Sequence, residues 1–381
     1  METNKNYYIN NIFSLLILGS IVLSLFDAFI IGDTSTVKLI SIGFALICII
    51  IFILRSSVFY FNQLLIIIFV WVFYNLIWLL LTYNQYYFSV IFQQLVLLLF
   101  VWSASNGDSP LKSIKQLKIV IVVYQIFAIY FMIFTERTGF STPLFAFTFF
   151  SLAMVSGTWK KVALCFLYMV VFWDSGDRSR VLALLVIALC IIILPKLGKR
   201  LYKVTFWTVT SIIILIPKIY LWMYNMSESS QWNVWVREFS GKNLFSGRQH
   251  LWGYLENYLS NHQLFGHGGN LVGGEFSVNY MFGMSSHNLF LFLRGQGGYL
   301  LLFLFVLFLY YIWLRFYNHL SNPYVLVGAA YLIGLLVRTS FDLVLMANNF
   351  VDSLYLWLPL VISLSLAQNM SRNKQTMQEP G

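Results

Sequence analysis

The stretch QLLIIIFVWVFYNLIWLLLT, residues 63–82, carries no charged side chain. A run of about 20 apolar residues is long enough to cross the hydrocarbon core of a bilayer as an α-helix. Similar runs recur along nearly the whole chain of 381 residues, in which 59% of the side chains are hydrophobic and only 10% are charged. Soluble domains carry about 25% charged residues. The sequence therefore predicts an all-α polytopic integral membrane protein.

Twelve membrane spans are predicted, and a long polar interval separates the ninth from the tenth. The spans before this interval cover residues 11–31, 37–54, 63–82, 86–104, 117–134, 142–157, 161–174, 180–195 and 204–222. The spans after it cover residues 297–315, 324–341 and 350–367. We therefore divide the chain into a transmembrane bundle (1–222), a loop (223–296) and a second membrane part with a terminal tail (297–381).

Basic side chains predict the orientation of these spans, because short loops rich in Lys and Arg stay in the cytoplasm. Every second short connection is basic, and the opposite ones are poor in Lys and Arg apart from Arg137, Arg178, Arg180 and Arg338. We expect both termini in the cytoplasm and the long loop outside. The net charge of +10 lies mainly in the cytoplasmic connections, so membrane lipids are expected partners and nucleic acid is not. The basic residues include Lys112, Lys115, Lys118, Lys160, Lys161, Lys196, Lys199, Arg200, Lys203 and Arg315.

Neither a cofactor nor a metal site is predicted. Cys48, Cys165 and Cys190 fall inside apolar runs and do not have the spacing of metal ligands. Asp174 and Asp177 lie beside arginines, which makes them a poor cation site. A metal-independent chemistry is expected.

The long loop is predicted to contain one helix. Ser246-Gly247-Arg248-Gln249 has the form of a capping box, and an apolar face at helical spacing follows it. This face consists of Leu251, Trp252, Leu255, Tyr258 and Leu259. The helix should end near Asn261, before a glycine-rich stretch, and lie on the membrane surface as a cap over the bundle. The chain should then re-enter the membrane through His287, Asn288 and an apolar run, and reach Arg294 before the tenth span.

Two arginines between the seventh and eighth spans are the first candidates for a binding site. Asp174-Ser175-Gly176-Asp177-Arg178-Ser179-Arg180 leaves no room for a flexible loop, so both guanidinium groups would be held at the outer surface. Arginine binds phosphate oxygens through paired hydrogen bonds, which suits a lipid-linked phosphate or pyrophosphate. The alternative is structural, with Asp174 and Asp177 pairing with the arginines and capping the helices.

Arg248 and His287 are the candidates on the loop. Arg248 falls in the first turn of the predicted helix, where free backbone N–H groups also favour an anion. The alternative for Arg248 is an exposed surface position. His287 lies at the predicted re-entry and could act as a general base or donate to a phosphate. The alternative for His287 is a hydrogen-bonded histidine at the membrane interface.

Four short motifs follow one another along the chain. They are Arg178-Ser179-Arg180, Gly247-Arg248, Leu264-Phe265-Gly266-His267-Gly268, and His287-Asn288 with Gly298 beyond. Their order, the span count and the large loop resemble the superfamily of O-antigen ligases and Wzy-type polysaccharide polymerases over most of the chain. The resemblance implies a C-type glycosyltransferase fold acting on undecaprenyl-pyrophosphate-linked glycans at the outer face of a bacterial inner membrane.

The resemblance also implies roles for the candidate residues. An acceptor sugar hydroxyl would attack the anomeric carbon of the donor glycan and expel undecaprenyl pyrophosphate with inversion. Arg180 and Arg248 would hold the pyrophosphate, with Arg178 as an alternative to Arg180. His287 would orient or deprotonate the acceptor, or contact a phosphate. Asn288 and Arg294 would contribute to substrate binding.

Three functions compete on this basis. The leading expectation is a polymerase that joins lipid-linked repeat units into O-antigen, capsule or exopolysaccharide, with donor and acceptor both lipid-linked and a chain-length regulator as a further partner. The second is an O-antigen ligase that transfers finished glycan to lipid A core. The third is a lipid-linked glycan flippase or other transporter. A transporter would place polar groups at the midplane and show repeated halves, whereas this chain concentrates them at one surface.

Overall fold

The computed structural model describes residues 2–29, 34–55, 63–82, 85–107, 109–135, 138–226, 228–241, 243–245, 247–268, 287–343, 345–346 and 350–376. Over these residues the protein consists of helices and turns, without a strand. The long helices are α1 (Glu2–Phe29), α2 (Thr34–Arg55), α3 (Gln63–Leu81), α4 (Gln85–Ser105), α5 (Leu111–Phe134), α6 (Ser141–Met154), α7 (Thr158–Asp174), α8 (Arg178–Ile193), α9 (Lys199–Tyr224), α14 (Leu289–Tyr317), α15 (Pro323–Thr339) and α16 (Phe350–Thr376). Two shorter helices, α10 (Ser229–Ser240) and α11 (Arg248–Leu259), follow α9.

Each predicted span falls on one of the long helices. Within the described residues, nine helices are long and apolar enough to cross a membrane. The others, α6, α7 and α15, have 14, 17 and 17 residues. The chain is therefore a helical polytopic membrane protein. Several helices start earlier than predicted: α1 begins at Glu2, α5 at Leu111, α9 at Lys199 and α14 at Leu289.

Helix α16 forms the centre of the bundle, and α15, α4, α6, α2 and α14 pack around it. Small residues on α15 allow its backbone to approach both neighbours closely, as at many helix interfaces in membranes. A Cβ atom on Gly328 would lie 2.0 Å from the Ser363 hydroxyl of α16, and one on Gly334 would lie 2.5 Å from Ile187 of α8. The tight packing of α15 fixes the position of its last turn, which matters for the site.

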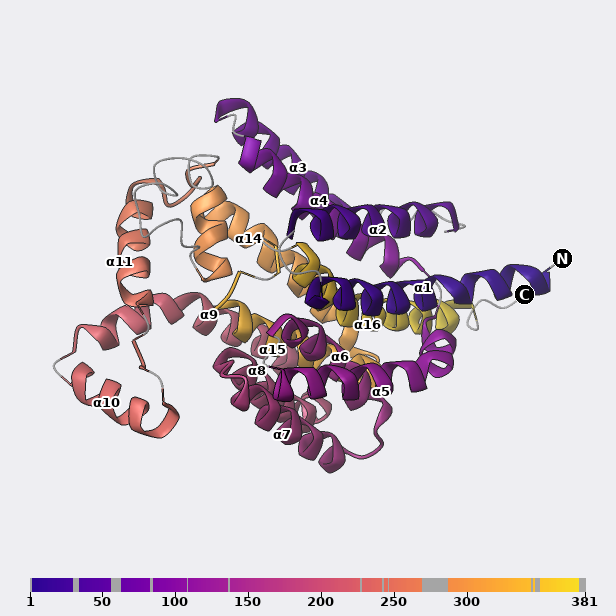
Figure 1. Cartoon of the computed structure of the whole chain (residues 1–381). Helices are drawn as coiled ribbons and strands as arrows, with labels where there is room; N and C mark the ends of the chain where they lie inside the picture. Colours follow the sequence, from indigo (N-terminus) through magenta and orange to yellow (C-terminus); the bar gives the residue numbers. More distant parts are fainter. Residues whose placement is uncertain are drawn as a thin grey trace.

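The helix predicted in the long loop is confirmed over Arg248–Leu259. Its apolar residues Leu251, Trp252, Leu255 and Leu259 are buried, and the helix packs on α9 and α14, so protein covers the face that was expected to meet the membrane surface. The helix begins after Gly247 without a side-chain cap, and Ser246 lies outside the described residues. In Figure 1, α10 and α11 lie at one end of the molecule, away from the start of α1 and the end of α16.

Helix α14 joins the predicted apolar run and the tenth span into one element with a break at Gly297 and Gly298. The break leaves backbone N–H and C=O groups of α14 without helical hydrogen-bond partners. The segment 263–268 provides partners for these groups. The N–H of His267 donates to the Gly295 carbonyl at 2.8 Å, and that of Gly268 to the Gln296 carbonyl at 2.9 Å. In return, the N–H of Tyr299 donates to the Gln263 carbonyl at 2.8 Å. The region from Gly269 to Ser286, with the predicted start of the re-entry, lies outside the described residues.

Candidate functional site

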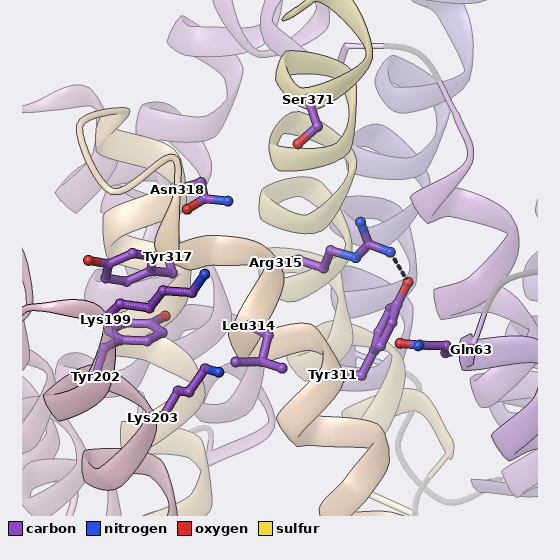
Figure 2. Close-up of a pocket in the computed structure, with 10 residues that line it drawn as sticks. All are labelled: Gln63, Lys199, Tyr202, Lys203, Tyr311, Leu314, Arg315, Tyr317, Asn318 and Ser371. Atoms are coloured by element: carbon purple, nitrogen blue, oxygen red, sulfur yellow. Dashed lines mark hydrogen bonds between the residues drawn. The ribbon is translucent and has the colours of Figure 1, made fainter. Parts of the chain in front are cut away.

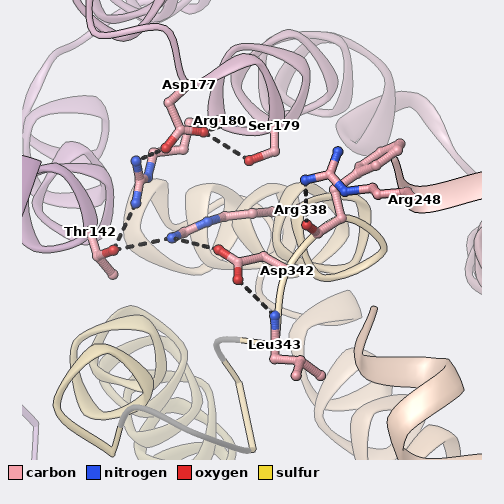
Figure 3. Close-up of polar contacts among 9 residues, drawn as sticks. Thr142, Asp177, Ser179, Arg180, Arg248, Arg338, Asp342 and Leu343 are labelled. Atoms are coloured by element: carbon pink, nitrogen blue, oxygen red, sulfur yellow. Dashed lines mark hydrogen bonds and ion pairs between the residues drawn. The ribbon is translucent and has the colours of Figure 1, made fainter. Parts of the chain in front are cut away.

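Two polar regions lie at opposite ends of α14. Near its C-terminal end is a basic pocket (Figure 2). Near its N-terminal end, arginines from α8, α11 and α15 gather around the residues that follow α15 (Figure 3). This arginine cluster, defined as Arg180, Arg248 and Arg338, is the candidate functional site.

Arg180 is held at the start of α8. Its side chain is 6% exposed, its Nη1 pairs with the carboxylate of Asp177, and its Nη2 donates to the Thr142 hydroxyl of α6 at 2.8 Å. Asp177 also caps α8 by accepting from the N–H of Arg180 at 3.3 Å. The structural alternative is thus shown for Asp177, whereas Asp174 forms no ion pair within the described residues. Even so, Nε of Arg180 has no hydrogen-bond partner in that part of the chain.

Arg338, in the last turn of α15, is the most deeply buried member of the cluster, with 0% exposure. Its Nη2 donates to the same Thr142 hydroxyl at 3.2 Å and lies 3.8 Å from a carboxylate oxygen of Asp342. Figure 3 shows that Arg180 and Arg338 both point to this hydroxyl. Nε and Nη1 of Arg338 have no hydrogen-bond partner among the described residues. A buried N–H without a partner costs about 1–3 kcal/mol, so these groups would gain from an acceptor.

Arg248 brings α11 to the segment after α15. Its Nη2 donates to the Phe341 carbonyl at 3.3 Å, and its guanidinium carbon lies 5.9 Å from the centre of the Phe341 ring. No carboxylate forms a salt bridge with Arg248 in the described part of the protein. Burial lowers the pKa of Arg248, but an arginine side chain stays protonated at any physiological pH. Among the described residues, Arg248 is therefore a cation without a salt-bridge partner.

His287 and Asn288 differ in what they can do. The Oδ1 atom of Asn288 accepts from the N–H of Leu291 at 2.9 Å and caps α14, while its Nδ2 donates to the Ser340 carbonyl at 2.7 Å. Asn288 is fully buried and serves to tie α14 to the segment after α15. Burial and the neighbouring Arg248 lower the pKa of His287, and Asp342 acts in the opposite direction. His287 is thus neutral near pH 7 and free to accept a proton.

Two predicted site residues have contacts outside the cluster. Arg294 donates to both carboxylate oxygens of Glu256, at 2.9 and 2.7 Å, and braces α14 against α11. Arg178 donates to the Asn243 carbonyl at 3.3 Å in an exposed position, although it is near enough to Arg248 to act on its charge. Of the two arginines in the first turn of α8, Arg180 is therefore the one within the arginine cluster.

Sequence reasoning did not assign Thr142, Arg338, Asp342 or Asp352 to the site. Asp352, in the first turn of α16, is electrostatically coupled to both Arg180 and Arg338. Two of these residues could have been singled out from the sequence. Arg338 breaks the positive-inside pattern, and Asp352 is a carboxylate in an apolar span. Nothing in the sequence distinguishes Thr142 from other threonines.

The described residues contain no group of three or more His, Cys, Asp or Glu side chains that could hold a metal ion. No protein-family model, curated protein or solved structure matches this chain.

Proposed function

We propose that this protein is a glycosyltransferase that polymerises undecaprenyl-pyrophosphate-linked glycan units at the outer face of a bacterial inner membrane. The observation that carries the proposal is the arginine cluster, in which Arg338 keeps Nε and Nη1 without a partner among the described residues. Guanidinium groups bind phosphate oxygens through paired hydrogen bonds. A pyrophosphate supplies the acceptors that these buried donors lack.

In this reaction the acceptor sugar hydroxyl attacks the anomeric carbon of the donor glycan. The bond from that carbon to the pyrophosphate oxygen breaks, and its electron pair stays on the leaving pyrophosphate. The hydroxyl proton passes to His287, whose lowered pKa keeps the imidazole neutral beforehand. Arg248 and Arg338 stabilise the negative charge that develops on the leaving group, and Arg180 completes the binding of the phosphates.

The position of the cluster along the helices favours this function over a transporter. Arg180 lies in the first turn of α8, Arg338 in the last turn of α15, and Arg248 begins α11. Charges at helix ends belong near a membrane surface, whereas a transporter site lies near the bilayer midplane. The proposed topology has twelve spans with both termini in the cytoplasm, a C-type glycosyltransferase arrangement, and the cluster outside.

Purified protein incubated with lipid-linked repeat units tests the proposal, with glycan length read from gels or mass spectra. We expect Arg248→Ala and Arg338→Ala to lower the elongation rate by about 10²–10³-fold, the usual effect of removing a donor to the developing charge. Arg178→Ala is the matched control, since its side chain is partly exposed and its hydrogen bond goes to the Asn243 carbonyl outside the cluster, so its rate should stay within a few-fold of wild type.

Two results would contradict the proposal. One is full elongation by both Arg248→Ala and Arg338→Ala, with correct folding verified by size-exclusion chromatography. If Arg338→Ala does not fold, Arg248→Ala decides, because Arg248 is only partly buried. The other is accumulation of long undecaprenyl-linked chains in cells that lack the protein, which would identify a ligase in place of a polymerase.

A further inference from the structure

A basic pocket lies between α9 and α14, at the end of α14 opposite to the arginine cluster. Helix α14 has 29 residues, so the two regions are roughly 40 Å apart along it. The pocket has a volume of about 330 Å³. Its lining residues, drawn in Figure 2, are Gln63, Lys199, Tyr202, Lys203, Tyr311, Leu314, Arg315, Tyr317, Asn318 and Ser371.

The side chains that line this pocket give it a positive charge. Lys199, Lys203 and Arg315 line it, and none of the lining residues is acidic. None of these cations forms a salt bridge within the described residues. A concave site lined by one sign of charge attracts the opposite charge strongly. Positive charge in cytoplasmic loops explains membrane orientation, but it does not require cations from two helices to meet in one cavity.

The walls of the pocket are rigid. Arg315 donates to the Tyr311 hydroxyl, and its guanidinium carbon lies 4.8 Å from the centre of the Tyr311 ring. Tyr202 stacks on Trp313 with ring centres 4.0 Å apart. The Tyr202 hydroxyl donates to the Trp313 carbonyl, and the Trp313 indole N–H donates to the Tyr202 carbonyl, each at 3.0 Å. The contact with Tyr311 orients the Arg315 guanidinium, and the Tyr202–Trp313 contacts hold α9 against α14, which reduces the entropy lost when a ligand binds.

An apolar strip continues from the pocket along the seam of α9 and α14. One turn beyond Lys203, Trp207 is 37% exposed, and its ring centre lies 4.9 Å from that of Tyr310. Further along α14, Phe303 is 52% exposed. Both helices are long and apolar enough to cross a membrane, where an exposed strip of this kind would meet acyl chains. A soluble phosphate compound would use the cations but not the strip.

We propose that this pocket binds the phosphate headgroup of an anionic membrane lipid, whose acyl chains lie along the strip of Trp207, Tyr310 and Phe303. The lipid phosphate accepts hydrogen bonds from Lys199, Lys203 and Arg315. Basic pockets between membrane helices recognise anionic headgroups in this way. This binding is independent of glycan transfer, because no residue of the pocket belongs to the arginine cluster.

Native mass spectrometry of the full chain, released from nanodiscs with equal amounts of phosphatidylglycerol and phosphatidylcholine, tests this proposal. Wild-type protein should retain phosphatidylglycerol in preference to phosphatidylcholine. The triple variant Lys199→Gln, Lys203→Gln, Arg315→Gln should lose this preference by roughly tenfold or more. The variant Lys112→Gln, Lys115→Gln, Lys118→Gln removes the same charge elsewhere on the predicted cytoplasmic side and should keep the preference. Arg338→Ala should keep it too, which separates this result from the proposed function.

Inorganic phosphate distinguishes a lipid from a soluble ligand. At millimolar concentration it should not displace retained phosphatidylglycerol, because it cannot occupy the apolar strip. Displacement by inorganic phosphate would show that the pocket takes a soluble phosphate and would overturn the proposal. Equal lipid retention by the wild type and the pocket variant would overturn it as well.

Discussion

Arg294 and Arg338 show that the number of buried donors without a partner, and not burial alone, distinguishes an arginine that can bind a ligand from a structural one. The two terminal nitrogens of Arg294 donate hydrogen bonds to the two carboxylate oxygens of Glu256. Arg338 is buried equally well, yet two of its nitrogens have no partner among the described residues. Removing a guanidinium from water is costly, and its attraction to Asp342 at 3.8 Å offsets only part of that cost. An arginine in this state gains more from an incoming phosphate than Arg294 does.

His287 leads to a prediction about pH. Burial and Arg248 lower its pKa below the ordinary value of about 6.5. A general base must be unprotonated, so the elongation rate should rise with pH through this lowered pKa and be constant near pH 7. Arg248→Gln removes one cause of the lowered His287 pKa. The loss of residual elongation activity at acidic pH should therefore occur at a higher pH in this variant. Rate profiles from pH 4.5 to 8 measure this. An acidic limb unchanged in both Arg248→Gln and His287→Gln would remove His287 from the mechanism.

At the scale of elements, the break in α14 and the segment 263–268 form one interlocked unit. Gly298 has a φ of +66°, and a Cβ atom there would lie 2.1 Å from the Leu264 carbonyl oxygen. Gly266 approaches from the other side, where a Cβ would lie 2.5 Å from the Gly298 nitrogen. Beneath the break, the Gln296 amide donates to Asn75 at 2.8 Å and exchanges hydrogen bonds with Gln94. The two glycine motifs thus serve to dock the loop on the bundle.

Substitution of these glycines should undock the loop. Gly298→Ala combines a strained backbone with a collision against the Leu264 carbonyl, so we expect a loss of about 1–3 kcal/mol or more in the stability of this region. Limited proteolysis between α11 and α14 should become faster, and the melting temperature should fall. Gly253→Ala in α11 is the control, because its nearest neighbour would be 3.6 Å away. Equal protease sensitivity of the two variants would contradict the interlocking role of Gly298.

At the scale of the whole molecule, the two ends of the bundle carry different chemistry. The arginine cluster gathers the start of α8, the end of α15 and the start of α11, whereas the basic pocket gathers the start of α9 and the end of α14. Helix α16 runs between them at the centre, with Asp352 in its first turn and Ser371 in the pocket wall. Figure 1 shows the loop helices α10 and α11 at the end that holds the cluster.

This difference between the two ends of the bundle predicts that they are accessible from opposite sides of the membrane. Single cysteines can be introduced directly, since Cys48, Cys165 and Cys190 are all buried. Ser230→Cys on α10 should react with a membrane-impermeant maleimide added to intact spheroplasts. Lys160→Cys at the start of α7 should react only after the membrane is permeabilised. Both positions are exposed in the protein, so a difference reports the side of the membrane. The reverse pattern would invert the proposed orientation and place the cluster in the cytoplasm.

The sequence by itself determined that the chain is helical and belongs in a membrane, and where most helices lie. Those properties depend on the apolarity of short continuous runs such as residues 63–82, so each can be judged from its own residues. The loop helix at Arg248 was predictable for the same reason, because its buried positions repeat at helical spacing. The break at Gly297 and Gly298 and the motif 264–268 both lie in glycine-rich stretches visible in the sequence, although their pairing was not predicted.

Only the tertiary structure decided which polar residues meet. Thr142, Arg180, Arg248 and Arg338 come from four helices, and their proximity depends on how closely α15 packs against α8 and α16. It also decided that the two terminal nitrogens of Arg294 pair with Glu256 and that Asn288 caps α14. The physical reason is that helix formation is governed by neighbouring residues, whereas the pairing of buried charges depends on side chains brought together by packing.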